Sequence, residues 1–170
     1  MRSITQFLEK RLKVKVNPDK TKVGSPLRLK FLGFSLGVDH NGAYARPAKQ
    51  SQQRVKKALR LLTKRNRGIS LTRMFEEIQR KMRGWLQYYS IGKLTDFIQR
   101  LDKWLRARIR QYIWKQWKKL KTKVTNLQKL GLSQRDAYVF ASTRKGYWRT
   151  AHSKTLSYSL TNRKLEQLGL

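Results

Sequence analysis

The side chains that could perform covalent or metal chemistry are few and widely spaced. The sequence has 170 residues, with no cysteine, two histidines (His40 and His152) and nine acidic residues. The lack of cysteine excludes disulfides, thiolate zinc sites and a cysteine nucleophile. Only Glu76 and Glu77 are adjacent carboxylates, and neighbouring helix positions point about 100° apart, which makes a poor chelate or acid–base couple. The sequence therefore predicts no catalytic residue, no metal site and no cofactor in this chain.

Positive charge dominates the composition. The chain carries 41 lysines and arginines against 9 acidic residues, a net charge of +32. With 39% hydrophobic and 11% aromatic residues it can bury a core, so we expect it to fold. Self-repulsion on this scale favours a polyanionic partner, and we predict that the partner is nucleic acid. Charges interrupt every apolar stretch, which predicts no signal peptide, no membrane span and no membrane partner; we expect a bacterial cytoplasm, or the interior of an organelle.

Lysines and arginines lie on the outer faces of three predicted helices, opposite the apolar stripes. Such a face is often only solvated, but the same sign recurs on all three helices with few acids between. A shared polyanion explains this better, because phosphate contacts supply affinity and register. The predicted RNA-binding side chains on these faces are Arg46, Lys49, Lys57, Arg60, Lys64, Arg65, Arg67, Arg73, Arg80, Arg83, Lys103, Arg106 and Arg110.

Two tryptophans accompany the basic face of the third helix. If that helix stays regular, a helical wheel places Trp114 and Trp117 beside Lys103, Arg106 and Arg110. Indoles on a basic face suit stacking on bases or riboses. The alternative is that the C-terminal segment folds back and buries both indoles. The sequence leaves both interpretations open.

A basic and aromatic loop is predicted near the C-terminus, between Arg144 and His152. It could grip an RNA backbone and stack a base. The alternative is a surface loop held by Trp148 in the core, with His152 a hydrogen-bonding surface residue. We favour RNA binding, because the loop is too basic and aromatic for a plain connector. Its predicted RNA-binding residues are Arg144, Lys145, Tyr147, Trp148, Arg149 and His152.

Gly84 is predicted on the outer side of the second long helix, near Arg80 and Arg83. Glycine costs about 1 kcal/mol in a helix interior, so something should approach closely there. Both RNA and another helix would satisfy this requirement. We favour another helix, because Trp85 needs tight packing around it.

Short elements are predicted before residue 46. Apolar spacing indicates a helix over about residues 1–12, and alternation indicates a strand over residues 13–16 with turn chemistry at 17–20. Apolar residues alternate again over 27–31, and Asn41-Gly42 between short apolar pieces is typical of a hairpin. So little sheet needs a further layer packed against it.

Long helices dominate the rest of the chain. Apolar stripes predict helices over residues 48–65, about 71–89 and about 94–118, which can cover one another as a bundle. We expect three regions: 1–45 with the hairpin, 46–119 with the three-helix bundle, and 120–170 as a basic helical extension. In the extension, Ser133 and Asp136 resemble a capping box, and Thr161 or Asn162 can start a last short helix. The fold class is therefore mainly α with a small β-hairpin region.

Three ordered motifs resemble group II intron-encoded reverse transcriptase/maturases. Residues 15–23, KVNPDKTKV, followed by KFLGFS at 30–35, are similar to the end of the palm in that family. Residues 83–89, RGWLQYY, resemble its maturase-specific thumb, and residues 142–151, STRKGYWRTA, resemble the tail of its bacterial members. The resemblance covers essentially the whole chain, and it implies a remnant of palm sheet followed by a helical thumb.

The resemblance also implies a function. Members bind their own intron RNA, help it fold and splice, and assist intron mobility by copying RNA into DNA. The resemblance places Phe31, Leu32, Gly33 and Phe34 in a primer-grip-like hairpin. It implies that residues 47–119 hold structured intron RNA or a template–primer RNA/DNA duplex.

The sequence departs from the family in its catalytic residues. The family's polymerase site needs a pair of palm aspartates that bind magnesium, and these would lie just before Met1. No Asp-Asp occurs in the sequence, so we assign no polymerase activity to this chain alone. Magnesium is expected for the RNA partner or for a complete polymerase. Two alternatives to an RNA-clamping maturase module stay open: the thumb half of a split or truncated RNA-directed DNA polymerase that takes palm and fingers from another chain, and a generic basic RNA chaperone.

Overall fold

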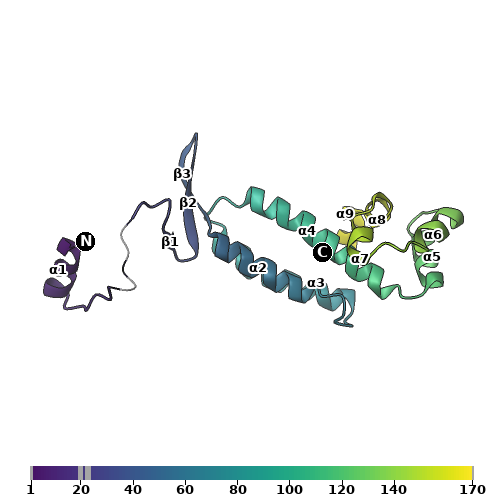
Figure 1. The fold of residues 1–170 in the computed structure, drawn as a ribbon, viewed down its shortest axis with the longest axis horizontal. Coiled ribbons are helices and arrows are strands. Elements are labelled where there is room, and N and C mark those ends of the chain that lie inside the picture. Colours follow the sequence, from purple (N-terminus) through teal and green to yellow (C-terminus); the bar gives the residue numbers. More distant parts are fainter. Residues whose placement is uncertain (1, 19–20, 22–23, 170) are drawn as a thin grey trace.

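Long helices form the middle of the molecule, with a small sheet followed by the N-terminal helix on one side and short helices on the other (Figure 1). This computed structural model describes residues 2–18, 21 and 24–169. In chain order the elements are α1 (Arg2–Arg11), β1 (Lys30–Phe31), β2 (Phe34–Asp39), β3 (Gly42–Pro47), α2 (Lys49–Leu62), α3 (Leu71–Tyr89), α4 (Thr95–Gln116), α5 (Leu120–Lys129), α6 (Gln134–Ala141), α7 (Tyr147–Ala151), α8 (Lys154–Ser159) and α9 (Asn162–Gln167). The predicted fold class, mainly α with a small β-hairpin region, is confirmed.

The three strands form an antiparallel sheet in the order β1-β2-β3. Val38 pairs with Ala43 and Asp39 with Gly42, so the predicted hairpin around Asn41-Gly42 is confirmed. Its turn is closed by a hydrogen bond from the Asn41 backbone N–H to Asp39 Oδ1 at 2.9 Å. An ion pair from Lys93 Nζ to Asp39 Oδ2, at 2.8 Å, ties the hairpin to the connection between α3 and α4.

Residues 13–16 do not form the predicted strand. Val14 is exposed, and this segment pairs with no strand in the part of the chain that the structure describes. Alternation alone was misleading here, because a strand needs a partner to satisfy its backbone groups. Met1 and the predicted turn residues Asp19 and Lys20 lie outside the described residues.

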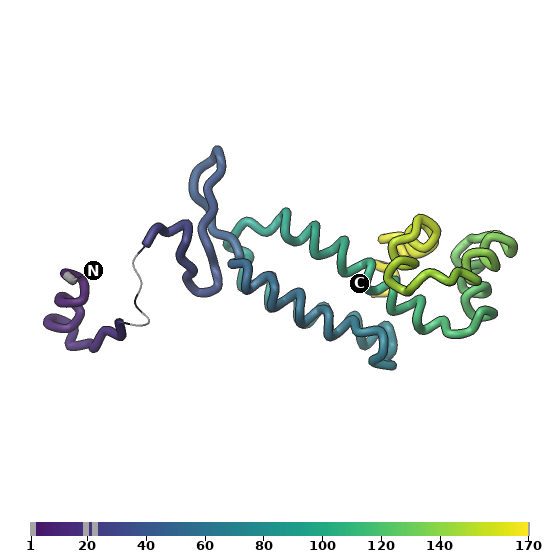
Figure 2. Tube along the Cα trace, viewed as in Figure 1, coloured from purple at the N-terminus to yellow at the C-terminus, as the bar shows by residue number. Residues whose placement is uncertain are grey.

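Helices α2, α3 and α4 form the predicted bundle. Helix α2 contacts both α3 and α4, and the tube in Figure 2 shows α2 and α4 running side by side. Ser70 caps α3 by accepting a hydrogen bond from the Arg73 backbone N–H at 3.2 Å. Each helix places its apolar stripe in one core, which explains why charge is confined to the opposite faces. Buried residues of these stripes include Val55, Leu59, Met74, Phe75, Ile78, Leu101, Leu105 and Ile109.

The segment from α5 to α9 folds back on the C-terminal half of α4. Its buried residues Leu127, Ala137, Leu156 and Leu165 belong to the same apolar cluster as the bundle core. Ser133 caps α6 as predicted, since its Oγ accepts from the Asp136 backbone N–H at 3.1 Å, but the reciprocal bond differs from a capping box: the Asp136 carboxylate accepts from the Ser133 hydroxyl at 2.7 Å. The extension therefore covers a helix face that sequence alone leaves open.

Candidate nucleic-acid interface

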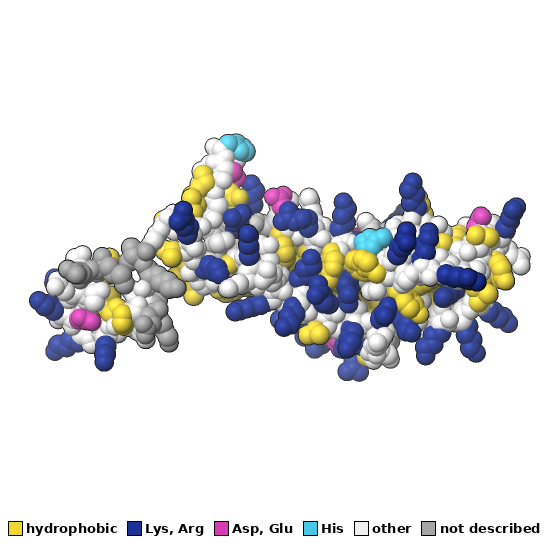
Figure 3. Space-filling model, viewed as in Figure 1, with side chains coloured by type: hydrophobic (Ala, Val, Ile, Leu, Met, Phe, Trp, Pro, Cys, Tyr) yellow, Lys and Arg dark blue, Asp and Glu magenta, His cyan; other side chains and the backbone are white. Residues whose placement is uncertain are grey.

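Outward-facing cations cover much of the helical part of the molecule. Figure 3 shows blue lysine and arginine side chains along the helices, with only isolated magenta acids among them. Many predicted cations are exposed, and their side chains make no hydrogen bond or ion pair with the described residues. Because phosphate binding requires uncommitted cations, these define the candidate interface. They are Arg46, Lys49, Lys57, Arg60, Lys64, Arg80, Arg83, Lys103, Arg144, Lys145 and Arg149.

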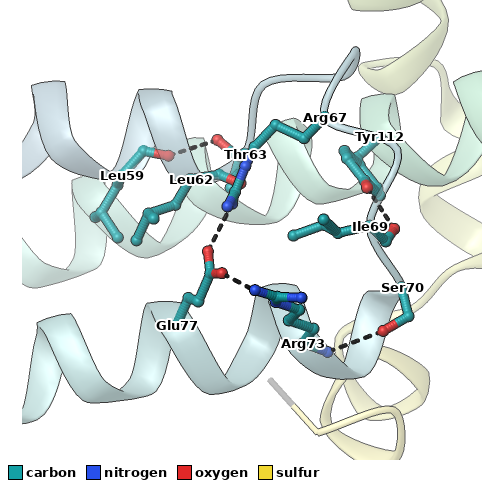
Figure 4. A network of polar contacts seen from close by, with 9 residues as sticks. All are labelled: Leu59, Leu62, Thr63, Arg67, Ile69, Ser70, Arg73, Glu77 and Tyr112. Atoms are coloured by element: carbon teal, nitrogen blue, oxygen red, sulfur yellow. Dashed lines mark hydrogen bonds and ion pairs between the residues drawn. The ribbon is translucent and has the colours of Figure 1, made fainter.

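Another predicted cation, Arg67, holds the connection between α2 and α3, and Arg73 pairs with the same carboxylate on its own helix (Figure 4). Arg67 Nη1 donates to the Leu62 carbonyl at 2.8 Å and to Glu77 Oε2 at 2.7 Å. Arg73 Nε lies 3.6 Å from Glu77 Oε1. The hydrogen bond from Arg67 lowers the pKa of Glu77 below its ordinary value. Tyr112 on α4 donates to the Ile69 carbonyl at 2.6 Å, so all three helices fix this connection.

Two predicted cations of α4, Arg106 and Arg110, are engaged within the chain, whereas Lys103 is exposed and has no partner among the described residues. Arg106 pairs with Asp102 at 2.8 Å and with Glu166 of α9 at 3.2 Å. Arg110 Nε donates to the Leu160 carbonyl at 2.9 Å. These two guanidinium groups therefore attach the C-terminal extension to α4.

Arg108, which the sequence reasoning did not select, closes the end of α2. Its guanidinium donates to Thr63 Oγ1 at 2.8 Å and to the carbonyls of Arg60 and Thr63 at 3.0 Å each. A cation at this end also opposes the negative pole of the helix dipole. Burial, with the neighbouring Arg60, lowers the pKa of Arg108 from its ordinary value. No carboxylate signals this role in the sequence, because the acceptors are one hydroxyl and two backbone carbonyls.

The stacking role predicted for Trp114 is wrong. Its side chain is only 2% exposed and lies against Phe140 of α6, with ring centroids 5.3 Å apart. Trp117 is half-buried beside it, at 5.9 Å. The alternative, that the C-terminal segment folds back over these indoles, is the correct one. The helical wheel could not show that another part of the chain covers this face, and it does not apply to Trp117, because α4 ends at Gln116.

The predicted loop from Arg144 to His152 contains helix α7, and Tyr147 holds it in place. Two cations lie over the Tyr147 ring: the Arg65 guanidinium at 4.8 Å and Lys115 Nζ at 5.3 Å from its centroid. Trp148 is 41% exposed and contacts His152 edge-on at 4.5 Å. The alternative in which Trp148 holds the loop in the core therefore fails. Trp148 presents a ring to solvent that a base could stack on.

A basic hollow lies between α2 and α4. Its volume is about 280 Å³, and its lining includes Lys49, Lys56 and Arg100 around Phe97. Lys56 Nζ also sits 5.1 Å from the Trp104 ring centroid. Sequence reasoning missed Lys56 and Arg100. The signal was available, since Lys49 and Lys56 are seven residues apart and share a helix face.

The primer-grip-like residues form a tight turn bonded to the helices. Phe31 pairs with Phe34, leaving Leu32 and Gly33 as a two-residue turn with φ of 48° and 80°. Tyr88 Oη donates to the Leu32 carbonyl at 2.8 Å, and Ser51 Oγ to the Gly33 carbonyl at 3.0 Å. A Cβ on Gly33 would lie 2.5 Å from Tyr89 Oη, so glycine is required here both by φ and by space.

Aromatic rings link this turn to the bundle, and they explain the RGWLQYY motif. Phe34 lies 4.9 Å from Tyr89, Tyr89 lies 4.5 Å from Trp85, and Trp85 lies 5.4 Å from Phe97 of α4, measured between ring centroids. Contacts of this kind add about 0.5–1.5 kcal/mol each beyond the area they bury. The motif therefore positions the hairpin on the helices, and the turn presents Phe31 and Leu32 outward, at 76% and 67% exposure.

One face of the sheet is apolar and open. A hollow of about 510 Å³ is lined by Pro26, Leu29, Phe31, Leu32, Phe34, Ser35, Leu36, Ala45 and Ile91. Almost no polar atom faces it, and no described residue fills it. An exposed apolar surface of this kind marks a site of association.

Two further properties limit the chemistry of the described residues. They contain no group of three or more histidine, aspartate or glutamate side chains that could hold a metal ion. None of their helices is both long enough and apolar enough to cross a membrane.

The arrangement of uncommitted cations and a half-exposed indole on a rigid helical scaffold is that of a protein that binds structured nucleic acid. Residues 52–131, from within α2 to just beyond α5, match the family described as group II intron, maturase-specific domain. Residues 52–131 therefore form a maturase-specific domain of the group II intron type, which implies a maturase function related to intron RNA and its splicing. No curated protein matches the chain.

Proposed function

We propose that this chain is an RNA-binding maturase module that clamps structured group II intron RNA and promotes its folding, splicing and mobility. The match over residues 52–131 supports the class of RNA. The observation that carries the clamp is the set of uncommitted cations on α2 and α3, exemplified by Lys57, Arg80 and Arg83, which differ from the engaged arginines of α4.

The proposed mechanism is electrostatic clamping with aromatic positioning. Cations on the outer faces of α2 and α3 contact phosphates, which provides affinity without reading sequence. Trp148, near Arg144, Lys145 and Arg149 in the sequence, adds a stacking surface on α7, which packs against α4. Restraining RNA at several separated points favours its folded form, which is how binding would promote splicing.

The test compares a group II intron transcript with an unrelated structured RNA of equal length, using fluorescence anisotropy over a range of salt. We expect at least about tenfold tighter binding to the intron. The logarithm of the association constant should fall with log salt by about 0.7–0.9 per phosphate neutralised. Equal affinity for both RNAs would leave a generic RNA chaperone, and an affinity that barely changes with salt would refute the clamp.

The open apolar hollow on the sheet favours a second candidate function. In this one, the chain acts as the thumb of an RNA-directed DNA polymerase on an RNA/DNA duplex, with palm and fingers supplied by another chain or segment. The magnesium needed for nucleotidyl transfer would then be held outside the described residues. The exposed Ile91 side chain at the rim of the hollow would pack against the missing palm.

This second candidate is tested by adding a group II intron reverse transcriptase palm-and-fingers polypeptide and measuring association and primer extension. Ile91→Asp should abolish both, because it places a charge in the buried contact. Val139→Asp, at an exposed apolar position on α6, is the matched control and should leave both unchanged. Failure of the wild-type chain to associate would exclude this function and leave the RNA clamp untouched.

A further inference from the structure

Gly84 has no role within the described chain. It lies inside α3, where an added Cβ would meet no heavy atom within 4 Å. The expectation that another helix approaches it is therefore wrong for the part of the chain that the structure describes. The neighbouring Trp85 turns inward to Tyr89 and Phe97 and needs no space at Gly84. A glycine that weakens its helix and supports no internal contact calls for an external one.

The surroundings of Gly84 are hollowed and basic. A depression of about 360 Å³ is lined by Glu76, Gln79, Arg80, Arg83, Gly84 and Gln87. Arg80, Arg83 and Gln87 are exposed, and their side chains form no hydrogen bond or ion pair with the described residues. Gln79 is already engaged, because its Nε2 donates to the Gly169 carbonyl at 2.8 Å.

We propose that this depression, the Gly84 notch, receives a sugar–phosphate strand of the RNA partner. Arg80 and Arg83 contact its phosphates, and the Gln87 amide bonds a ribose 2′-hydroxyl, a group that lies in the shallow minor groove of RNA helices. The inference rests on the proposed RNA-binding function and names the point of closest approach. The missing side chain at Gly84 lets the strand touch the helix backbone.

The lining of the notch favours RNA over a protein partner. No apolar side chain lines it, so a helix or strand of another protein would gain little from burial there. Its lining contains two positively charged arginines but only one carboxylate, Glu76, which lies at the N-terminal end of the depression. Phosphates are therefore expected nearest Arg80 and Arg83.

The decisive variant is Gly84→Ala, because stability and binding should change in opposite directions. Alanine is the better helix former and has free space here, so the thermal midpoint of the RNA-free protein should rise by about 2 °C. The added methyl group would occupy the point of contact, so the affinity for the intron transcript should fall about tenfold. A larger side chain in Gly84→Leu should cause a greater loss of affinity, again without unfolding the protein.

Thr125→Ala is the matched control. Thr125 is exposed on α5, away from the notch, and alanine there also favours the helix. This variant should gain stability and bind RNA with unchanged affinity, which separates contact at Gly84 from a general effect of rigidity. A double-mutant cycle adds a second measurement: in the Arg80→Gln/Arg83→Gln background, Gly84→Ala should lose at most about twofold in affinity, because the strand is no longer held there.

Each outcome has one meaning. Tenfold weaker binding by Gly84→Ala, with raised stability and no effect of Thr125→Ala, supports the notch. Unchanged RNA affinity of Gly84→Ala, in a protein whose wild type prefers the intron, overturns it and leaves the proposed function standing. If the wild type shows no preference for intron RNA, the proposed function itself has failed.

Discussion

The outer faces of α3 and α4 carry the same kind of charge but use it differently. On α4, Arg106 and Arg110 donate to groups of the C-terminal extension, and their charge holds the fold together. On α3, Arg80 and Arg83 have no partner among the described residues and are available to a ligand. The difference shows that the spatial neighbours of a cation, which a helical wheel does not contain, decide whether it serves stability or binding.

The largest expected effect is on stability, at the contact between α4 and the C-terminal extension. Trp114→Ala removes a buried indole from between α4 and the extension, and should lower the free energy of unfolding by about 3–5 kcal/mol. Chemical denaturation without RNA measures it. Trp148→Ala, at a partly exposed indole, should cost less than about 1 kcal/mol but weaken RNA binding. If Trp114→Ala weakened RNA binding while Trp148→Ala caused the larger loss of stability, Trp114 would belong to the RNA interface after all.

A charge-matched pair of double variants gives the next effect. Arg106→Gln/Arg110→Gln should destabilise the protein by about 2 kcal/mol, because part-buried bonds to the extension are lost. Arg80→Gln/Arg83→Gln removes the same charge, should leave stability within about 0.5 kcal/mol, and should reduce the slope of log affinity against log salt by about 1.4–1.8. Denaturation and salt titration of both proteins check this. If both double variants changed stability and the salt slope by the same amounts, the faces of α3 and α4 would not differ in role.

The smallest effect concerns acid. Arg67 holds the pKa of Glu77 below its ordinary value, so this carboxylate contributes stability that is fully present above the unfolded-state pKa and lost as pH falls through the folded one. Between about pH 5 and about pH 3, Glu77→Gln should therefore lose less stability than wild type. Glu76→Gln is the control, since Glu76 is exposed and forms no ion pair with the described residues. Parallel curves for Glu77→Gln and wild type would contradict the pairing.

Local patterns predicted most of the fold because they report local physics. The stripes through Val55, Met74 and Ile109, the caps Ser70 and Ser133 and the Asn41-Gly42 turn all act within a few residues of sequence. The strand over 13–16 was predicted wrongly, because a strand depends on a partner that alternation does not reveal.

The candidate site was harder to predict for the same reason. Outward direction was predicted correctly for Arg80 and Arg83, but the contacts of Arg106 and Arg110 with the C-terminal extension were not visible, because those acceptors lie 50 to 60 residues further along the chain. Arg108 was missed because it binds two backbone carbonyls and the Thr63 hydroxyl, 45 residues away, rather than a nearby carboxylate. Trp114 was ambiguous because its covering residue, Phe140, belongs to another helix.

The turn at Leu32-Gly33 has a mechanical consequence. Its two carbonyls accept hydrogen bonds from side chains on α3 and α2, and Phe34 beside it stacks on α3. The turn and the two helices are therefore joined by these contacts, so a tilt between the sheet and the long helices would have to break two hydrogen bonds and a ring stack.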